Sequence, residues 1–312
     1  MKILLHLPTW LGDAVMTTPA IENIVQTFPN AQITLFGSFV STQALAKHPN
    51  VTRIVVDDSK KAKWRYLRFY QLAQELGKFE IVFNFRRTFT ANFLQFILKS
   101  PKKFSYKRYT KNQIHQVLRY NDFINTSLKT EHKPSTLTLY HDRFTYDKPT
   151  LGINPGATYG SAKRWYPERF SEVASKLSSK YDIIIFGGPG EVDIAVDIEK
   201  ILKEEGIKNY KNLAGKTSVP QLLEHIAGLT CFVTGDSGPM HVAAAYQVPT
   251  VSLFGPTKDI ETSQWMNQKS TIIRHDLECA PCMKRQCPLT KDKHACMKLI
   301  TPQEVIEAVL AL

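Results

Sequence analysis

The 312-residue sequence has no run of about 18 or more apolar residues, so it offers no membrane-spanning helix. It also lacks low-complexity tracts, and its 17 Phe, 12 Tyr and 4 Trp exclude a disordered chain. No Gly-x-Gly-x-x-Gly fingerprint follows the first strand, which argues against a Rossmann dehydrogenase. No small-residue cleavage site follows the apolar start, which we interpret as the first strand of a cytoplasmic protein rather than a signal peptide.

Acidic residues are scarce in the first half of the chain only. Residues 1–150 contain 22 Lys and Arg against 10 Asp and Glu, whereas residues 151–312 contain 18 of each. The net charge of +12 therefore belongs to the first half. A bias of this kind predicts an anionic partner, which is a nucleic acid, an acidic membrane surface, or a phosphorylated or carboxylated substrate.

Short apolar stretches alternate with amphipathic helical patterns, which predicts parallel α/β sheets. Strands are expected at 2–7, 32–36, 51–56 and 80–85, and again at 150–154, 181–186, 231–234 and 250–254. A polar segment over 129–150 predicts a junction between domains 1–148 and 149–312. We expect two Rossmann-like parallel-sheet domains facing a central cleft, with ligands at the carboxyl ends of the strands. A final amphipathic helix, 302–312, can pack back on the first domain.

The turn Trp10-Leu-Gly-Asp13 lies between the first strand and the first helix. A carboxylate at that position can reach a ligand in the cleft, which favours a role for Asp13 in proton transfer. The alternative is that Asp13 only caps the helix, a position that Asp favours.

Three loops of the second half follow strands and carry small, polar or charged residues. One extends from Thr234 through Asp236, Ser237 and Gly238 to His241 and opens a helix, which suits a diphosphate. Another, Asn154 to Trp165, carries Lys163 and Arg164, whose charges suit phosphate. The third, Gly187-Gly-Pro-Gly-Glu191, offers a carboxylate for ribose hydroxyls. A purely structural turn is the alternative for the first of these loops, and a solvated loop with incidental cations is the alternative for the second.

At these loops the sequence resembles the lipopolysaccharide core heptosyltransferases, the family 9 glycosyltransferases with the GT-B fold. The resemblance rests on Gly12-Asp13, on Asn-Pro-Gly-Ala (154–157) with Ala-Lys-Arg-Trp (162–165), and on Asp-Ser-Gly-Pro-Met-His-Val-Ala-Ala-Ala (236–245). Phe-Gly-Pro-Thr (254–257) fits the same pattern. The Ala-Lys-Arg-Trp loop and the late cysteines are most similar to the members that add the second heptose. One departure is Tyr166, inserted before Pro167.

The resemblance implies an inverting transfer from ADP-heptose to the anionic lipopolysaccharide inner core, without a catalytic cofactor. It implies that Asp13 is the general base and that Lys163 supports the leaving diphosphate. The donor site implied comprises Gly12, Asn154, Gly156, Thr158, Lys163, Gly188, Glu191, Asp236, Ser237, Gly238, Met240 and His241. Trp10, Lys60, Arg86 and Arg87 are the candidates for acceptor binding. The enzyme is expected at the cytoplasmic side of the inner membrane of a Gram-negative bacterium, in peripheral contact with it.

Basic and aromatic residues are interleaved between 60 and 111, which also suits single-stranded nucleic acid. Given the donor loops, we expect the anionic partner to be the acceptor glycolipid and not a nucleic acid. The alternatives are a heptosyltransferase acting at another core position, a transferase using another nucleotide sugar, and a nucleic-acid-binding α/β protein.

Four of the five cysteines lie close together late in the chain, as Cys279, Cys282, Cys287 and Cys296. In a cytosolic protein such clusters more often bind metal than form disulfides. Structural zinc would stabilise a loop that has few apolar residues, but the spacing of these four cysteines is not a standard zinc-binding one. Reduced thiols and disulfides are the alternatives.

Overall fold

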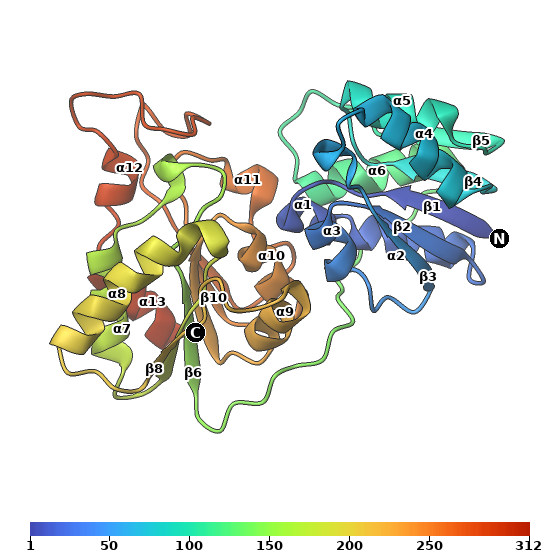
Figure 1. The fold of residues 1–312 in the computed structure, drawn as a ribbon. Helices are drawn as coiled ribbons and strands as arrows, with labels where there is room; N and C mark the ends of the chain where they lie inside the picture. Colours follow the sequence, from blue (N-terminus) through green and yellow to red (C-terminus); the bar gives the residue numbers. More distant parts are fainter. The chain divides into compact units, whose positions relative to one another are not determined.

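Short apolar strands build one parallel sheet in each half of the chain (Figure 1). The computed structural model describes residues 1–312, which divide into the units Met1–Tyr140 and His141–Leu312. Strands β1 (Lys2–His6) and β2 (Gln32–Gly37) are buried after their first residue because helices cover both faces of the sheet. The predicted fold class, two Rossmann-like α/β domains, is confirmed.

The sheet of the first unit has the strand order β3-β2-β1-β4-β5. Its other strands are β3 (Val51–Val56), β4 (Ile81–Asn84) and β5 (Lys102–Ser105). The helices are α1 (Leu11–Met16), α2 (Thr18–Thr27), α3 (Phe39–Ala44), α4 (Arg65–Leu76), α5 (Phe89–Ile97) and α6 (Gln116–Leu128), with a 3₁₀ turn η1 (Ser59–Lys61). Phe69 of α4 and Leu94 of α5 pack with Val82 in a buried core.

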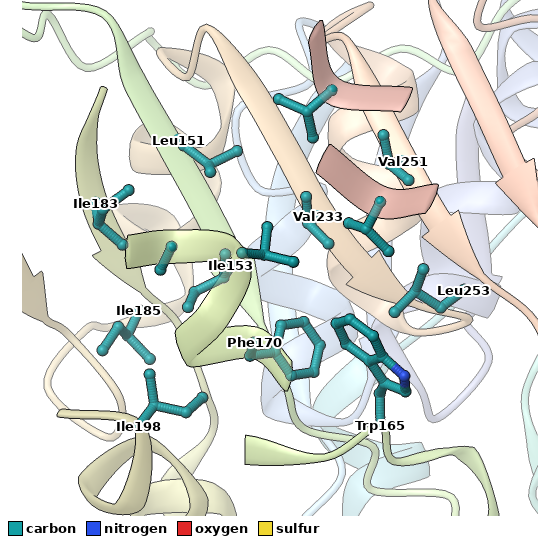
Figure 2. Close-up of a cluster of buried hydrophobic side chains, with 14 of the residues drawn as sticks. Leu151, Ile153, Trp165, Phe170, Ile183, Ile185, Ile198, Val233, Val251 and Leu253 are labelled. Atoms are coloured by element: carbon teal, nitrogen blue, oxygen red, sulfur yellow. The ribbon is translucent and has the colours of Figure 1, made fainter. Parts of the chain in front are cut away.

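The sheet of the second unit has the order β11-β10-β9-β6-β7-β8. Its strands are β6 (Thr150–Asn154), β7 (Asp182–Ile185), β8 (Tyr210–Asn212), β9 (Cys231–Gly235), β10 (Thr250–Leu253) and β11 (Ser270–Ile273). Helices are α7 (Pro167–Leu177), α8 (Val192–Glu204), α9 (Val219–Ala227), α10 (Gly238–Ala245), α11 (Asp259–Thr262), α12 (Ala295–Lys298) and α13 (Pro302–Ala311), with 3₁₀ turns η2 (Ser161–Lys163) and η3 (Pro189–Glu191). In its core, Trp165 and Phe170 pack edge to face below the strands (Figure 2).

The division between the two units lies earlier in the chain than expected. The division falls after Tyr140 rather than after residue 148, because Phe144 and Tyr146 hydrogen bond to α9 of the second unit. In the final helix α13, Val305 and Val309 are buried in the core of the second unit. No helix of the chain is both long and apolar enough to cross a membrane.

Each sheet has one topological switch point, where the chain stops adding strands on one side of the first strand and begins adding them on the other side. In the first unit this point lies between β1 and β4, and in the second between β6 and β9. Ligands of open parallel sheets bind at the carboxyl ends of the strands beside such points. The loops singled out in the sequence, after β1, β6, β7 and β9, begin at these ends.

Candidate functional site

The switch point of the second unit is lined by polar side chains from both flanking strands. Asn154, at the end of β6, is paired in register with Thr234 of β9 and donates to its hydroxyl over 3.3 Å. Thr234 in turn lies 3.0 Å from the hydroxyl of Ser237, which precedes α10. The first amides of α10 therefore face this edge, where a helix N-terminus favours an anion.

Lys163 reaches the same edge from the loop after β6. Its Nζ lies 2.6 Å from Asp236 Oδ2, donates to the Asp236 carbonyl over 3.1 Å, and lies 4.7 Å from the ring centre of Tyr159. The Lys163 and Asp236 side chains are only 12% and 7% exposed. Because a carboxylate repels a diphosphate, Asp236 is better placed to orient Lys163 than to contact a phosphate itself.

The carboxylate of Glu191 connects the loop after β7 with the loop after β6. It is buried, accepts the Gly188 N–H over 2.7 Å, and accepts the Thr158 hydroxyl over 3.4 Å. A Cβ on Gly156 would lie 2.1 to 2.4 Å from this carboxyl group, so any other residue there would force the Glu191 carboxyl group to move. The structure thus brings together four of the predicted donor residues, and ribose binding by Glu191 stays a prediction.

Asp13 lies in the first turn of α1, after the carboxyl end of β1. The residue that caps α1 is Trp10, so the alternative that Asp13 caps the helix is wrong. The Tyr120 hydroxyl approaches Asp13 Oδ1 at 3.5 Å, and burial, then the Asp13 charge, raise the pKa of this tyrosine. Gly12 is buried in the same turn, and Trp10 is 55% exposed.

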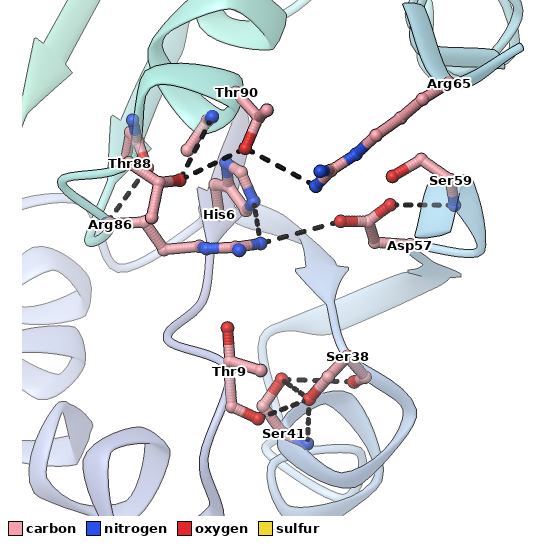
Figure 3. Close-up of polar contacts among 12 residues, drawn as sticks. His6, Thr9, Ser38, Ser41, Asp57, Ser59, Arg65, Arg86, Thr88 and Thr90 are labelled. Atoms are coloured by element: carbon pink, nitrogen blue, oxygen red, sulfur yellow. Dashed lines mark hydrogen bonds and ion pairs between the residues drawn. The ribbon is translucent and has the colours of Figure 1, made fainter. Parts of the chain in front are cut away.

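Arg86 follows β4 and faces a group of side chains that the sequence analysis missed (Figure 3). Its Nη1 lies 3.2 Å from His6 Nε2 and 3.5 Å from Asp57 Oδ2. Burial lowers the pKa of Arg86, Asp57 raises it, and the nearby Arg65 lowers it further. Asp57 pairs with Arg86, and Arg65 adds a second positive charge nearby. Lys60 and Arg87 are exposed.

Comparison with known proteins decides the class of this chain. A model of glycosyltransferase family 9 (heptosyltransferase) matches residues 125–293. The chain belongs to this family. It is 42% identical to "Lipooligosaccharide heptosyltransferase 2" of Campylobacter jejuni over 98% of this chain and 97% of the relative.

Two solved structures share the fold of this family 9 glycosyltransferase along its whole length. "Structure of E. coli ADP-heptose lps heptosyltransferase II" matches with a TM-score of 0.81 and 23% identity, covering 100% of this chain and 98% of the other. "E. coli heptosyltransferase WaaC with ADP" matches with a TM-score of 0.79 and 17% identity, covering 100% and 99%. The fold of the family is therefore present in full.

A late segment of the glycosyltransferase braces its Lys163 loop, which the sequence analysis did not foresee. Arg285 accepts the Ala162 N–H at its carbonyl over 3.1 Å, and His294 Nε2 lies 2.9 Å from the Ala162 carbonyl. Tyr166, the departure from the family pattern, places its hydroxyl 2.8 Å from His294 Nδ1. The extra tyrosine therefore ties the loop to the cysteine-bearing segment.

Two predicted donor residues are buried, and the predicted zinc site is not confirmed. The side chain of Met240 is fully buried in the glycosyltransferase and that of His241 nearly so, and donor binding by either residue stays a prediction. All five cysteines are free thiols, and no group of three or more His, Cys, Asp or Glu could hold a metal. Burial, and next the neighbouring Cys279, Cys282 and Cys287, raise the pKa of Cys296 to about 11. The structure therefore does not confirm the predicted structural zinc.

Gly156→Ala is expected to destabilise the glycosyltransferase by about 1–3 kcal/mol and to weaken ADP binding, because the new methyl group overlaps the Glu191 carboxyl group. Urea unfolding and calorimetry measure both effects. Gly190→Ala is the matched control, since nothing lies within 4 Å of its added Cβ. Equal stability of the two variants would contradict the packing of Glu191 against Gly156.

His6 is expected to make the glycosyltransferase less stable in mild acid. Burial, and next the Arg86 charge, hold the pKa of His6 well below its ordinary value of 6.5. Below about pH 6.5 the unfolded chain binds a proton that folded His6 does not, so the free energy of unfolding falls by up to about 1.4 kcal/mol per pH unit.

Urea unfolding at pH 7.5 and pH 5.5 measures this dependence, with His6→Gln as the comparison. The other histidines with lowered pKa, His225 and His294, remain in both proteins, so their contributions cancel in the difference. The variant should lose part of the pH dependence. The same fall in stability in both proteins would show that His6 titrates normally.

Proposed function

We propose that this glycosyltransferase moves heptose from ADP-L-glycero-D-manno-heptose to the heptosyl-Kdo-lipid A inner core, in lipopolysaccharide or lipooligosaccharide biosynthesis. The observation that carries the proposal is the Lys163 ammonium, which Asp236 holds beside the amides at the start of α10, an arrangement that suits a diphosphate. The name of the C. jejuni relative, heptosyltransferase 2, supports the second heptose position. The structural neighbour with ADP supports an adenine nucleotide donor.

Asp13 is the general base in this proposal. Its carboxylate takes the proton of the acceptor hydroxyl, and the oxygen attacks the anomeric carbon of the donor in line with the leaving group. The bond from that carbon to the diphosphate oxygen breaks as the new glycosidic bond forms, so the configuration inverts without a covalent intermediate. ADP leaves with the bonding electron pair.

Charge develops on the leaving diphosphate, and the chain has its own groups to stabilise it. The Lys163 ammonium and the amides at the start of α10 supply fixed positive charge, which is worth most at a site shielded from water. The proposed transfer uses no cofactor. Gly156, Thr158 and Gly188 hold Glu191, whose carboxylate is the proposed ribose contact.

The acceptor is proposed to bind the first unit through its anionic groups. Arg86 and the exposed Lys60 and Arg87 offer positive charge, which suits the sugar acids and phosphates of the inner core. Trp10 offers an exposed ring beside Asp13 for a sugar face. We place the enzyme at the cytoplasmic side of the inner membrane of a Gram-negative bacterium. We do not propose a nucleic acid as its partner. Retention on a heparin column that does not change when ADP-heptose is added would instead favour a nucleic-acid partner.

Genetic complementation tests the position of the transfer. The gene is expressed in Escherichia coli strains that lack heptosyltransferase I, II or III, and their lipopolysaccharide is measured by mass spectrometry. We expect the missing heptose to return in the strain that lacks II. Restoration only in the strain lacking I or III would assign the enzyme to that position, and restoration in none would contradict the proposal.

Structural zinc at Cys279, Cys282, Cys287 and Cys296 stays a prediction. The pattern of the four cysteines in the sequence supports it. In the structure these cysteines are free thiols that are not placed to hold a metal, so they would have to move closer together to bind zinc. Elemental analysis of protein purified without chelator decides between zinc and reduced thiols. About one zinc per chain supports the metal, and none removes it.

A further inference from the structure

Helices α4 and α5 of the first unit expose large apolar side chains instead of burying them. Tyr66, Leu67 and Tyr70 of α4 are 53 to 56% exposed. At the start of α5, Phe89 is 73% exposed, and near its end Phe96 is 80% exposed. Single exposed apolar residues are ordinary on a protein surface, whereas a group of them marks an interaction site.

We group these side chains with Trp64, which is 71% exposed, under the name α4–α5 face. The rings of Tyr66 on α4 and Phe93 on α5 meet edge to face with their centres 5.2 Å apart. Arg65 at the start of α4 donates to the Thr90 hydroxyl at the start of α5 over 3.5 Å. The two helices therefore lie side by side at their first turns.

The chain around this face is strongly basic. Residues 60–103 contain eleven Lys and Arg against two acidic residues, Glu75 and Glu80. Glu75 is engaged by Arg68 at 2.7 Å, and Glu80 accepts the Lys2 backbone N–H at 2.6 Å. Exposed lysines precede α4 and follow α5, and these are Lys60, Lys61, Lys63, Lys99, Lys102 and Lys103.

We propose that the α4–α5 face docks on an anionic lipid bilayer. Aromatic rings favour the interface between lipid headgroups and acyl chains, and lysines around them add attraction to anionic headgroups. A second copy of the chain is a poor occupant, because it would bring two faces of the same positive charge together. The inference rests on the proposed function, in which the acceptor is itself anchored in the membrane by lipid A.

The position of the face within the first unit agrees with such an acceptor. Trp64 and Phe89 stand at the N-terminal ends of α4 and α5, next to Arg65 and Thr90. Arg65 is also close enough to Arg86 to lower its pKa, so the face begins beside the cationic group proposed for the acceptor. A glycolipid held in a bilayer at this face would present its sugars to that group.

Flotation with lipid vesicles tests the inference on the full chain. Vesicles of phosphatidylglycerol and phosphatidylethanolamine are compared with neutral phosphatidylcholine vesicles at low and high salt. Wild type should bind the anionic vesicles and release them at high salt. Tyr70→Ser with Phe96→Ser should weaken binding by at least about tenfold, because each ring leaves the lipid interface. The control, Val196→Ser with Leu310→Ser, removes side chains of 50% and 48% exposure from the second unit and should bind like wild type.

The transfer assay separates this inference from the proposed function. With a delipidated, water-soluble acceptor, the Tyr70→Ser, Phe96→Ser variant should transfer as wild type does, and with acceptor in vesicles it should be slower. Vesicle binding without any transfer would overturn the proposed function and keep the docking face. No wild-type binding to anionic vesicles, or equal binding by both double variants, would overturn the face. A concentration-dependent dimer that the variant loses would assign the face to a second copy instead.

Discussion

Replacing Asp13 with asparagine is expected to lower the turnover number by about 10²–10⁴-fold, with the affinity for ADP unchanged. The amide keeps the size of the side chain but cannot accept the acceptor's proton. Asp13 lies after β1 at the switch point of the first sheet, where a ligand group is expected. Turnover is measured by ADP release at saturating substrates, and ADP affinity by calorimetry.

Two further variants make this result specific. Asp122→Asn changes a partly buried carboxylate on α6 beside Arg119 and should leave turnover near normal. Tyr120→Phe removes the hydroxyl that approaches Asp13 and should shift the pH profile of turnover with a smaller loss of rate. A near-normal rate for Asp13→Asn would refute its role as the base.

Lys163→Ala is expected to weaken ADP binding by about 10- to 100-fold, the usual value of a hydrogen bond to a charged group. Its ammonium is the only cation that the structure places against Asp236 at the start of α10. Calorimetric titration with ADP measures the loss. Lys176→Ala, which removes an exposed lysine from the last turn of α7, is the control and should bind ADP normally.

The Lys163 variant also leaves the Asp236 carboxylate buried without its cation, which destabilises proteins. Lys163→Arg keeps a positive charge and should retain more affinity than Lys163→Ala, and thermal unfolding of each variant shows whether the fold is intact. Unchanged ADP affinity in a folded Lys163→Ala protein would refute the diphosphate site.

The sequence predicted the central strands of both sheets and the edge strand β3, but not the edge strands β5, β8 and β11. Strands such as 2–7 and 150–154 carry apolar residues on both faces because both faces are buried. The edge strands β5 and β8 read Lys-Lys-Phe-Ser and Tyr-Lys-Asn, which carry no apolar run to identify them. Helix α5 was missed because Phe89 and Phe96 lie on its exposed face and obscure the amphipathic pattern.

The candidate site was predictable where its residues follow one another in a motif. Lys163, Asp236 and Glu191 stand in loops after strands, and those loops carry the family pattern. Contacts between distant segments had no such signal, as with His6 and Asp57 around Arg86 or His294 behind Ala162. The position of Asp57 directly after β3 was the one available clue.

The most direct measurement of the central claim is nucleotide release from ADP-heptose on addition of a monoheptosylated inner-core acceptor. The wild-type protein should release one ADP for each heptose gained by the acceptor, and release should nearly stop without acceptor or in Asp13→Asn. Binding of ADP-heptose with no acceptor-dependent release, or heptose transfer only to an acceptor that carries no heptose, would contradict the account.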